Sequence, residues 1–194
     1  MQFLRMFSTD NYKGNKDYLK TQKKYEILRT VLYFAISLSI FIGGWAATKT
    51  RLNLLTVVAV LGCLPACKSL VGMIMFLRFQ GCASENAQII EEHMEGLTGL
   101  FDMVFTSYEK NYNVAHITVK GNTLCGFTQD AAFDEQTFYK HLDGILKLEH
   151  YKDVSVKIFK DIHKYADRLE QLKSLNTDEE NTAGIVETLK SVAL

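Results

Sequence analysis

Nineteen consecutive residues, from Thr30 to Thr48, carry no charge. As a helix rising about 1.5 Å per residue, this stretch nearly spans a hydrocarbon core about 30 Å thick. The alternative is a buried helix of a soluble protein, but soluble helices of this length normally keep a polar face. Tyr33 and Trp45 lie near its ends, where aromatic side chains gather at membrane surfaces. We therefore expect a transmembrane helix here.

A second apolar stretch runs from Leu52 to Leu77 and contains Pro65 and Lys68. Pro65 is expected to kink this helix. A lysine well inside a span is costly, so Lys68 has three interpretations. It extends to the lipid headgroups, it faces the first helix or a neighbouring subunit, or it lines a transport path. We favour the first, because a long lysine stem reaches the membrane surface readily.

The short polar turn between the two stretches predicts an antiparallel hairpin with both ends on one side. The segment before the first stretch is rich in basic residues, whereas the turn has only Lys49 and Arg51. The basic residues before the span are Lys13, Lys16, Lys20, Lys23, Lys24 and Arg29. The positive-inside rule then places the N-terminus and the tail in the cytoplasm of a two-span cell-membrane protein. The basic segment sets orientation and lies on anionic headgroups, or else it binds a specific lipid.

The expected organisation has three parts: a basic N-terminal segment at 1–29, a transmembrane hairpin at 30–79 and a soluble cytoplasmic domain at 80–194. Gly43, Gly44 and Gly62 offer small surfaces for close helix approach within the hairpin. The segment from Asn11 to Val71 resembles a group of small, uncharacterised bacterial membrane proteins that consist of a two-helix hairpin and a soluble α/β tail. This resemblance covers about the first third of the chain and implies no activity.

Charge is divided unevenly along the chain. Residues 1–79 contain eleven Lys and Arg against three Asp and Glu, whereas residues 80–194 contain eleven against nineteen. An acidic tail disfavours binding to a polyanion, so no nucleic-acid partner is expected. The four cysteines are too sparse for a disulfide-stapled secreted domain, and we expect reduced thiols.

The tail predicts an α+β domain with the element order α-βββ-α-β-α-α. Residues 114–120 alternate, with Ala115, Ile117 and Val119 expected on one face. The expected strands are 103–109, 114–120, 123–128 and 154–159. The expected helices are 84–100, one from an N-cap at Asp134 to about residue 149, 161–175, and one after a capping box of Thr177 and Glu180.

This element order resembles the core of the restriction-endonuclease-like fold, which implies a possibly degenerate version of it. The resemblance implies an active site with an aspartate on one strand and a Glu-x-Lys motif on the next strand, and these residues together hold Mg²⁺. Here Lys120 ends Thr-Val-Lys and lacks the glutamate, and the next expected strand is uncharged. An active nuclease is therefore not expected.

His116, Lys120 and Cys125 are the weak candidates for catalysis. His116 and Cys125 lie on neighbouring expected strands, and a Cys/His pair can act as nucleophile and base. The alternative is a half-buried thiol beside a surface histidine, which we favour because no third group is evident. No phosphate-binding glycine loop or metal-ligand spacing occurs, so no cofactor or metal is expected.

Three hypotheses follow for the function. The first, which we favour, is a non-enzymatic interaction or assembly module at the cytoplasmic membrane face, with the lipid bilayer and a protein partner or a second copy as its contacts. The second is a membrane-tethered hydrolase or degenerate nuclease-like enzyme. The third is a small oligomeric transport component, because two spans per chain are too few to enclose a path alone.

Overall fold

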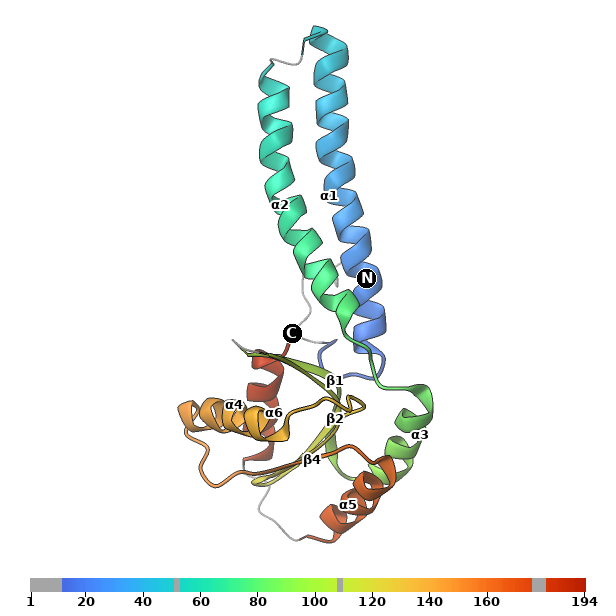
Figure 1. Ribbon diagram of the computed structural model, residues 1–194, viewed down its shortest axis with the longest axis vertical. Coiled ribbons are helices and arrows are strands. Elements are labelled where there is room, and N and C mark those ends of the chain that lie inside the picture. The colour runs from blue at the N-terminus through green and yellow to red at the C-terminus, as the bar shows by residue number, and fades with distance from the viewer. Residues whose placement is uncertain (1–11, 51–52, 108–109, 176–180) are drawn as a thin grey trace. The chain divides into compact units, whose positions relative to one another are not determined.

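The structure is a computed structural model that describes residues 12–50, 53–107, 110–175 and 181–194. Its elements fall into two compact units (Figure 1). Within the described residues, one unit consists of 19–79 and the other of 12–18 with 80–194. The chain is α+β, with two long apolar helices followed by a four-stranded mixed sheet and its covering helices.

The first unit is a pair of long helices, α1 (Tyr18–Thr48) and α2 (Leu54–Arg78). Both are long and apolar enough to cross a membrane. Asn53 caps α2, since its side chain accepts a hydrogen bond from the Thr56 backbone N–H at 2.8 Å. Pro65 lies inside α2, and the helix continues through it without a break.

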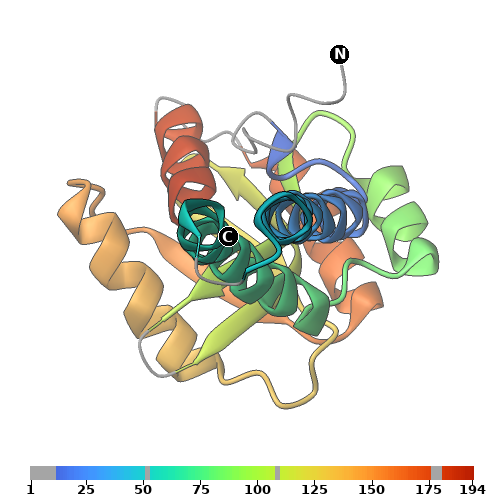
Figure 2. The ribbon, with the colours of Figure 1, turned by 90° about the horizontal axis from the view of Figure 1, so that it is seen from above.

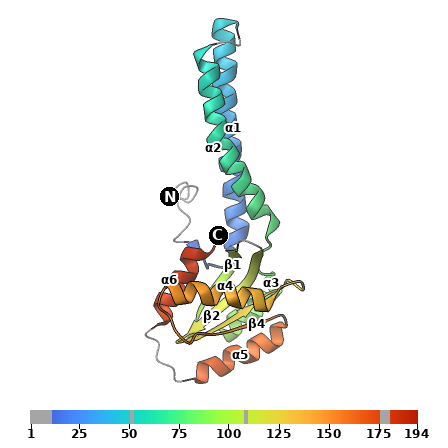
Figure 3. The ribbon, with the colours of Figure 1, turned by 60° about the vertical axis from the view of Figure 1, so that its left-hand side comes forward.

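The two helices meet along small and polar side chains, and Figures 1 and 3 both show them side by side. The facing pairs recur every seven residues: Thr30 with Ser69, Ser37 with Gly62 and Gly44 with Leu55. The Thr30 and Ser69 hydroxyls lie 2.9 Å apart, and a Cβ added to Gly62 would lie 2.8 Å from Ser37 Oγ. A seven-residue repeat that places a small residue in each facing pair is typical of closely packed helices that cross at a shallow angle.

The second unit is built on a sheet of four strands in the order β1-β2-β3-β4. The strands are β1 (Thr98–Thr106), β2 (Asn111–Lys120), β3 (Thr123–Phe127) and β4 (Ser155–Phe159). The first three form an antiparallel meander, whereas β4 is parallel to β3. The parallel pair is joined by α4 (Glu135–Leu148), as such a connection requires a crossover.

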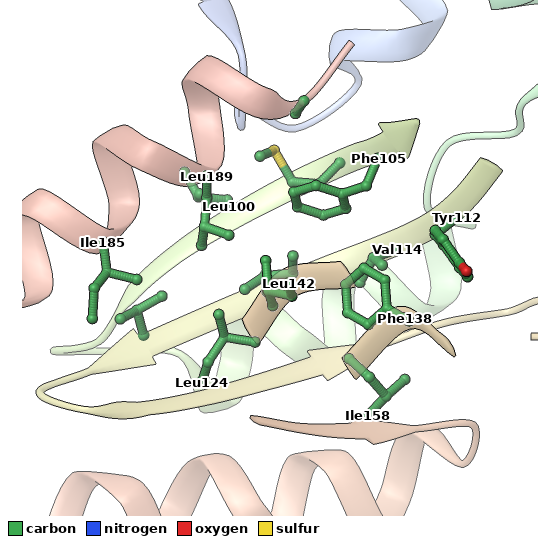
Figure 4. Packing of buried hydrophobic residues seen from close by; sticks show 14 of the residues in the cluster. Leu100, Phe105, Tyr112, Val114, Leu124, Phe138, Leu142, Ile158, Ile185 and Leu189 are labelled. Carbon is green, nitrogen blue, oxygen red and sulfur yellow. The ribbon is translucent and has the colours of Figure 1, made fainter. Parts of the chain in front are cut away.

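Helices cover both faces of the sheet, as Figures 2 and 3 show. On one face, α4 and α6 (Thr182–Val192) pack over a core that includes Phe105, Phe138 and Leu189 (Figure 4). On the other, α3 (Ser84–His93) and α5 (Ile162–Ser174) pack over a smaller core around Tyr165. Because helices cover both faces, β1, β2 and β3 are almost wholly buried, whereas only Ile158 is buried in β4.

The expected element order is confirmed, the N-cap of α4 lies at Asp134 as the sequence predicts, and α5 begins within one residue of its expected start, with Asp161 as its N-cap. Asp134 accepts hydrogen bonds from the Thr137 backbone and hydroxyl, and Asp161 accepts from the His163 backbone. These bonds, with Lys110 nearby, hold the pKa of Asp134 below its ordinary value. The proposed capping box of Thr177 and Glu180 lies outside the described residues.

The helix expected at 84–100 is shorter than predicted. It ends at His93, and Gly96 follows with φ of +78°. From Thr98 the chain pairs with β2 instead. Met94 and Leu97 still pack on the core next to α3, so the helical spacing of apolar residues persists through the turn and misled the prediction.

The face predicted for Ala115 is wrong. Ala115 packs with Phe101 on the side of α3 and α5, whereas Ile117 packs on the side of α4 and α6. Phe101 pairs with His116 and Met103 with Val114, so Ala115 lies opposite Asp102. Asp102 has φ of +55°, and at this point the alternation of side chains between the two faces of the sheet shifts by one residue. The shift occurs in β1 and β2 together, so the pairing register is preserved.

The segment before α1 belongs to this second unit. Phe101 N–H donates a 2.8 Å hydrogen bond to the Gly14 carbonyl, which adds a one-residue bridge to the outer edge of β1. The end of the chain reaches the same edge, where Phe105 bridges Ala193. The domain is therefore discontinuous in sequence: residues 12–18 and 80–194 fold together, with the helix pair inserted between them.

Candidate functional site

His116 lies at the centre of a buried polar network on the face covered by α3 and α5. Its Nδ1 is 2.7 Å from the Tyr165 hydroxyl, which is 3.1 Å from Thr118 Oγ1. Its Nε2 is 3.1 Å from Met94 Sδ. The arrangement fits a neutral imidazole that accepts from Tyr165 and presents Nε2–H to the sulfur. The interpretation of His116 as a surface residue is therefore wrong, because it is fully buried.

Burial sets the protonation of this network. Loss of solvent lowers the pKa of His116 to about 3 and raises that of the Tyr165 hydroxyl. Both groups are thus neutral at physiological pH. A neutral histidine with both ring nitrogens engaged supports packing rather than proton transfer to a substrate.

Cys125 shares this face with His116 but is not its hydrogen-bond partner among the described contacts. Thr118 is the residue across from Cys125 in the β2–β3 ladder. The thiol is buried, which raises its pKa, and the nearby Arg168 and Lys157 cations offset this only in part. A buried thiol with a raised pKa is a poor nucleophile. The sequence predicts a half-buried thiol at Cys125, whereas the structure encloses it fully.

Lys120 is at the far end of β2, where its ammonium donates a 3.1 Å hydrogen bond to the Lys173 carbonyl at the end of α5. A lysine there satisfies a helix C-terminus. The three candidates thus have separate structural roles. Within the part of the chain that the structure describes, no group of three or more His, Cys, Asp or Glu side chains could hold a metal ion.

Two of the basic residues assigned to membrane orientation contact the folded domain. Lys13 Nζ donates to the carbonyls of Lys190 and Ala193 at the end of α6, at 3.3 and 2.8 Å. Lys16 forms a 2.8 Å salt bridge with Glu91 of α3. These contacts could not be predicted from the sequence, because the partners are 75 to 180 residues away.

The other basic residues lie on α1. Lys20 and Lys24 are exposed and Lys23 is half-buried. Arg29 forms a salt bridge with Glu26 and donates from Nε to Ser69 Oγ at 3.2 Å. Glu26 is almost completely buried, and sequence reasoning overlooked it. Its spacing of three residues from Arg29, on one helix face, is the signal that identifies it.

Lys68, Pro65 and Trp45 all have exposed side chains. Ser69 faces α1 at the level of Thr30, and the side chain of Lys68 beside it is exposed. Lys68 thus stands at the level where the uncharged stretch of α1 begins. The interpretation of Lys68 stays a prediction.

A surface groove of about 380 Å³ runs between α4 and the edge strand β4. Its apolar lining includes Phe138, Val156 and Ile158, and Figure 4 shows Phe138 and Ile158 side by side. Tyr139 stands on its wall with 45% of its surface exposed. Sequence reasoning missed this site, because the groove exists only once α4 has crossed over to β4.

The backbone beside this groove has an open edge. Ser155 N–H bonds to the Asn122 carbonyl and Phe159 C=O accepts from Thr128 N–H, both toward β3. Because successive residues of a strand point their backbone groups to opposite sides, Val156 and Ile158 direct theirs outward. β4 is the last strand of the sheet on this side.

Comparison with protein-family models, curated proteins and solved structures found no match to this chain.

Proposed function

We propose that this protein is a non-enzymatic interaction or assembly module, anchored in the cell membrane by α1 and α2, with its α+β domain on the cytoplasmic side. The observation that carries the proposal is the discontinuous domain. Lys13 and Gly14 before α1 contact α6 and β1 after α2. This discontinuity supports the proposal, because the two ends of a transmembrane hairpin lie on one side of the membrane.

The internal use of the candidate catalytic groups supports a role without chemistry. His116 and Tyr165 satisfy each other, Cys125 is enclosed, and Lys120 caps α5. The surface of the domain instead offers an apolar groove beside an open sheet edge. Such a surface is suited to recognition of another polypeptide.

Cysteine labelling in intact cells tests the membrane placement. Cys125 itself is buried and would not report, so two exposed positions are used, Thr50→Cys between the helices and Lys152→Cys in the domain. Both are made in a chain whose four native cysteines are replaced. A membrane-impermeant maleimide is expected to label Thr50→Cys in intact cells and Lys152→Cys only after lysis. The reverse pattern would place the domain outside the cytoplasm.

The interaction function is tested by the mass of the particle extracted from native membranes in mild detergent. Light scattering is expected to give the mass of the chain plus a stoichiometric second protein or second copy. A monomer of this chain alone, recovered repeatedly after chemical crosslinking in the membrane, contradicts the proposal.

The alternative is a membrane-tethered hydrolase or degenerate nuclease-like enzyme. The observation that favours it is the strand order with β4 parallel to β3, which fits the α-βββ-α-β arrangement. Lys120→Ala and Cys125→Ser test it in cells that depend on the protein. If both variants support growth as well as the unaltered chain, this alternative is abandoned.

A further inference from the structure

We propose that β4 and the groove beside α4 bind an extended segment of a partner protein, which adds to the sheet as a fifth strand and carries acidic residues among apolar ones. This inference rests on the interaction function proposed above and names its surface. The outward N–H and C=O groups of Val156 and Ile158 can be satisfied by a strand, and a sheet edge is a template for one.

The groove supplies what an added strand needs for its side chains. Alternate residues of such a strand would face the α4 side, over Phe138 and Ile158. Ile158 is buried and Val156 half-buried, so the apolar floor of the sheet extends to its last strand. α4 provides a wall through Tyr139, which is largely exposed in the described chain.

Charge selects the kind of segment. Lys157 is exposed on the opposite face of β4, with its ammonium 5.1 Å from the centre of the Phe159 ring. Lys140 is exposed beside the groove, and Glu135, which also lines it, has Lys160 as a partner at 3.8 Å. A carboxylate directly across the strand pair from Lys157 would be favoured, and a cation disfavoured.

The same lysine argues against pairing of two copies of β4. An antiparallel pair that uses the outward groups of Val156 and Ile158 places Lys157 of each copy opposite the other. Two like charges so close are destabilising, and lysines on edge strands commonly prevent this kind of association. The occupant is therefore a different polypeptide segment.

The test uses a fluorescent seven-residue peptide of alternating valine and glutamate, with the full chain in nanodiscs of phosphatidylcholine. Binding is followed by fluorescence anisotropy. A second peptide has the backbone nitrogens of one edge methylated, and a third has lysine in place of glutamate. The first peptide is expected to bind at least about tenfold more tightly than the other two. Equal binding of the methylated peptide, or no binding of the first at about 1 mM, overturns the site.

Two variants separate backbone pairing from the side chain. Val156→Pro removes an N–H that points away from β3, so the fold is expected to be kept, as far-UV circular dichroism and the urea midpoint will show. Val156→Ala keeps that N–H. Peptide affinity is expected to fall about tenfold for proline and less than threefold for alanine. Equal loss for both variants overturns the pairing model.

The partner itself distinguishes failure of this site from failure of the function. A protein that copurifies with the unaltered chain is expected to be lost from Val156→Pro and retained by Val156→Ala. A partner that stays bound to Val156→Pro overturns the site, while the interaction function stands. A homodimer that Val156→Pro dissociates overturns the choice of occupant in favour of a second copy.

Discussion

Asp102 Oδ1 accepts a 2.7 Å hydrogen bond from the backbone N–H of Cys82, in the connection between α2 and α3. The carboxylate is buried, and Asp102 has a left-handed backbone at the point where β1 and β2 change phase. A charged residue in that conformation inside a strand needs compensation. The bond to Cys82 supplies part of it and fixes the start of the domain after α2.

Replacement of Asp102 by alanine is expected to destabilise the domain. Asp153→Ala is the matched control, because Asp153 has φ of +57° but is exposed. Both lose a residue that tolerates positive φ, whereas only Asp102→Ala leaves the buried Cys82 N–H without its acceptor. We expect a difference of about 2 kcal/mol in the free energy of unfolding. Urea unfolding in mild detergent, followed by far-UV circular dichroism, measures it, and equal losses would contradict this role.

Gly14→Ala tests whether the segment before α1 is part of the domain. Gly14 has φ of +84°, and an added Cβ would lie 2.5 Å from Leu100 Cδ2. Gly96 has φ of +78° with nothing within 4 Å of such a Cβ. Both alanines carry the backbone strain, about 1 kcal/mol, but only Gly14→Ala also overpacks, at about 1–3 kcal/mol more. If the two variants unfold at the same urea concentration, the docking of this segment is refuted.

The buried histidine predicts a pH dependence of stability. His116 has a pKa of about 3 in the folded domain because of burial, against about 6.5 when unfolded. Between these values the unfolded chain binds the extra proton, so His116 makes stability fall as pH decreases from about 6.5 toward 3. Its contribution is about 1 kcal/mol per pH unit.

Comparison of the unaltered chain with His116→Gln separates the contribution of His116 to the pH dependence of stability from the contribution of the carboxylates. The variant is expected to be less stable at pH 7, but its stability should fall less steeply between pH 6.5 and 4. Urea midpoints at several pH values give both slopes. Parallel slopes would mean that His116 is not buried as a neutral group.

The contact between α1 and α2 predicts different effects at two glycines. Gly62 faces Ser37, whereas a Cβ at Gly43 meets nothing within 4 Å. Gly62→Leu should separate the helices and destabilise the pair by about 1–3 kcal/mol, and Gly43→Leu should have little effect. Trp45, the only tryptophan, reports separation by its fluorescence during titration with SDS. Equal effects of the two leucine substitutions would show that α1 and α2 do not make contact at Gly62.

Local chemistry explains what the sequence could predict. Asp134 and Asp161 cap helices through neighbours two or three residues away, so α4 and α5 could be placed closely. The long uncharged stretch likewise predicts the part of α1 from Thr30 to Thr48, but α1 begins at Tyr18, within the basic segment. α3 was extended too far because Met94 and Leu97 keep helical spacing after the helix has ended at His93.

What the sequence could not predict depends on distant contacts. The role of Lys13 requires α6, 180 residues away at Ala193, and the burial of His116 requires Tyr165 on α5. The change of strand phase at Ala115 depends on the backbone of Asp102 in another strand. The groove is formed by α4 and β4 together, and from the sequence the apolar residues of each element are predicted only to belong to the core.

Because the helix pair interrupts the sequence of the domain, it also imposes an order on synthesis and folding. Residues 12–18 leave the ribosome before the rest of α1 and all of α2, yet their partners on β1 and at Lys190 and Ala193 are made only after α2. If α1 and α2 enter the membrane as they emerge, the early segment must wait beside the bilayer until the last helix is released. Closure of the domain then follows insertion, and a chain in which only one of the two helices crosses the membrane would leave the two parts of the domain on opposite sides, where neither can complete the fold.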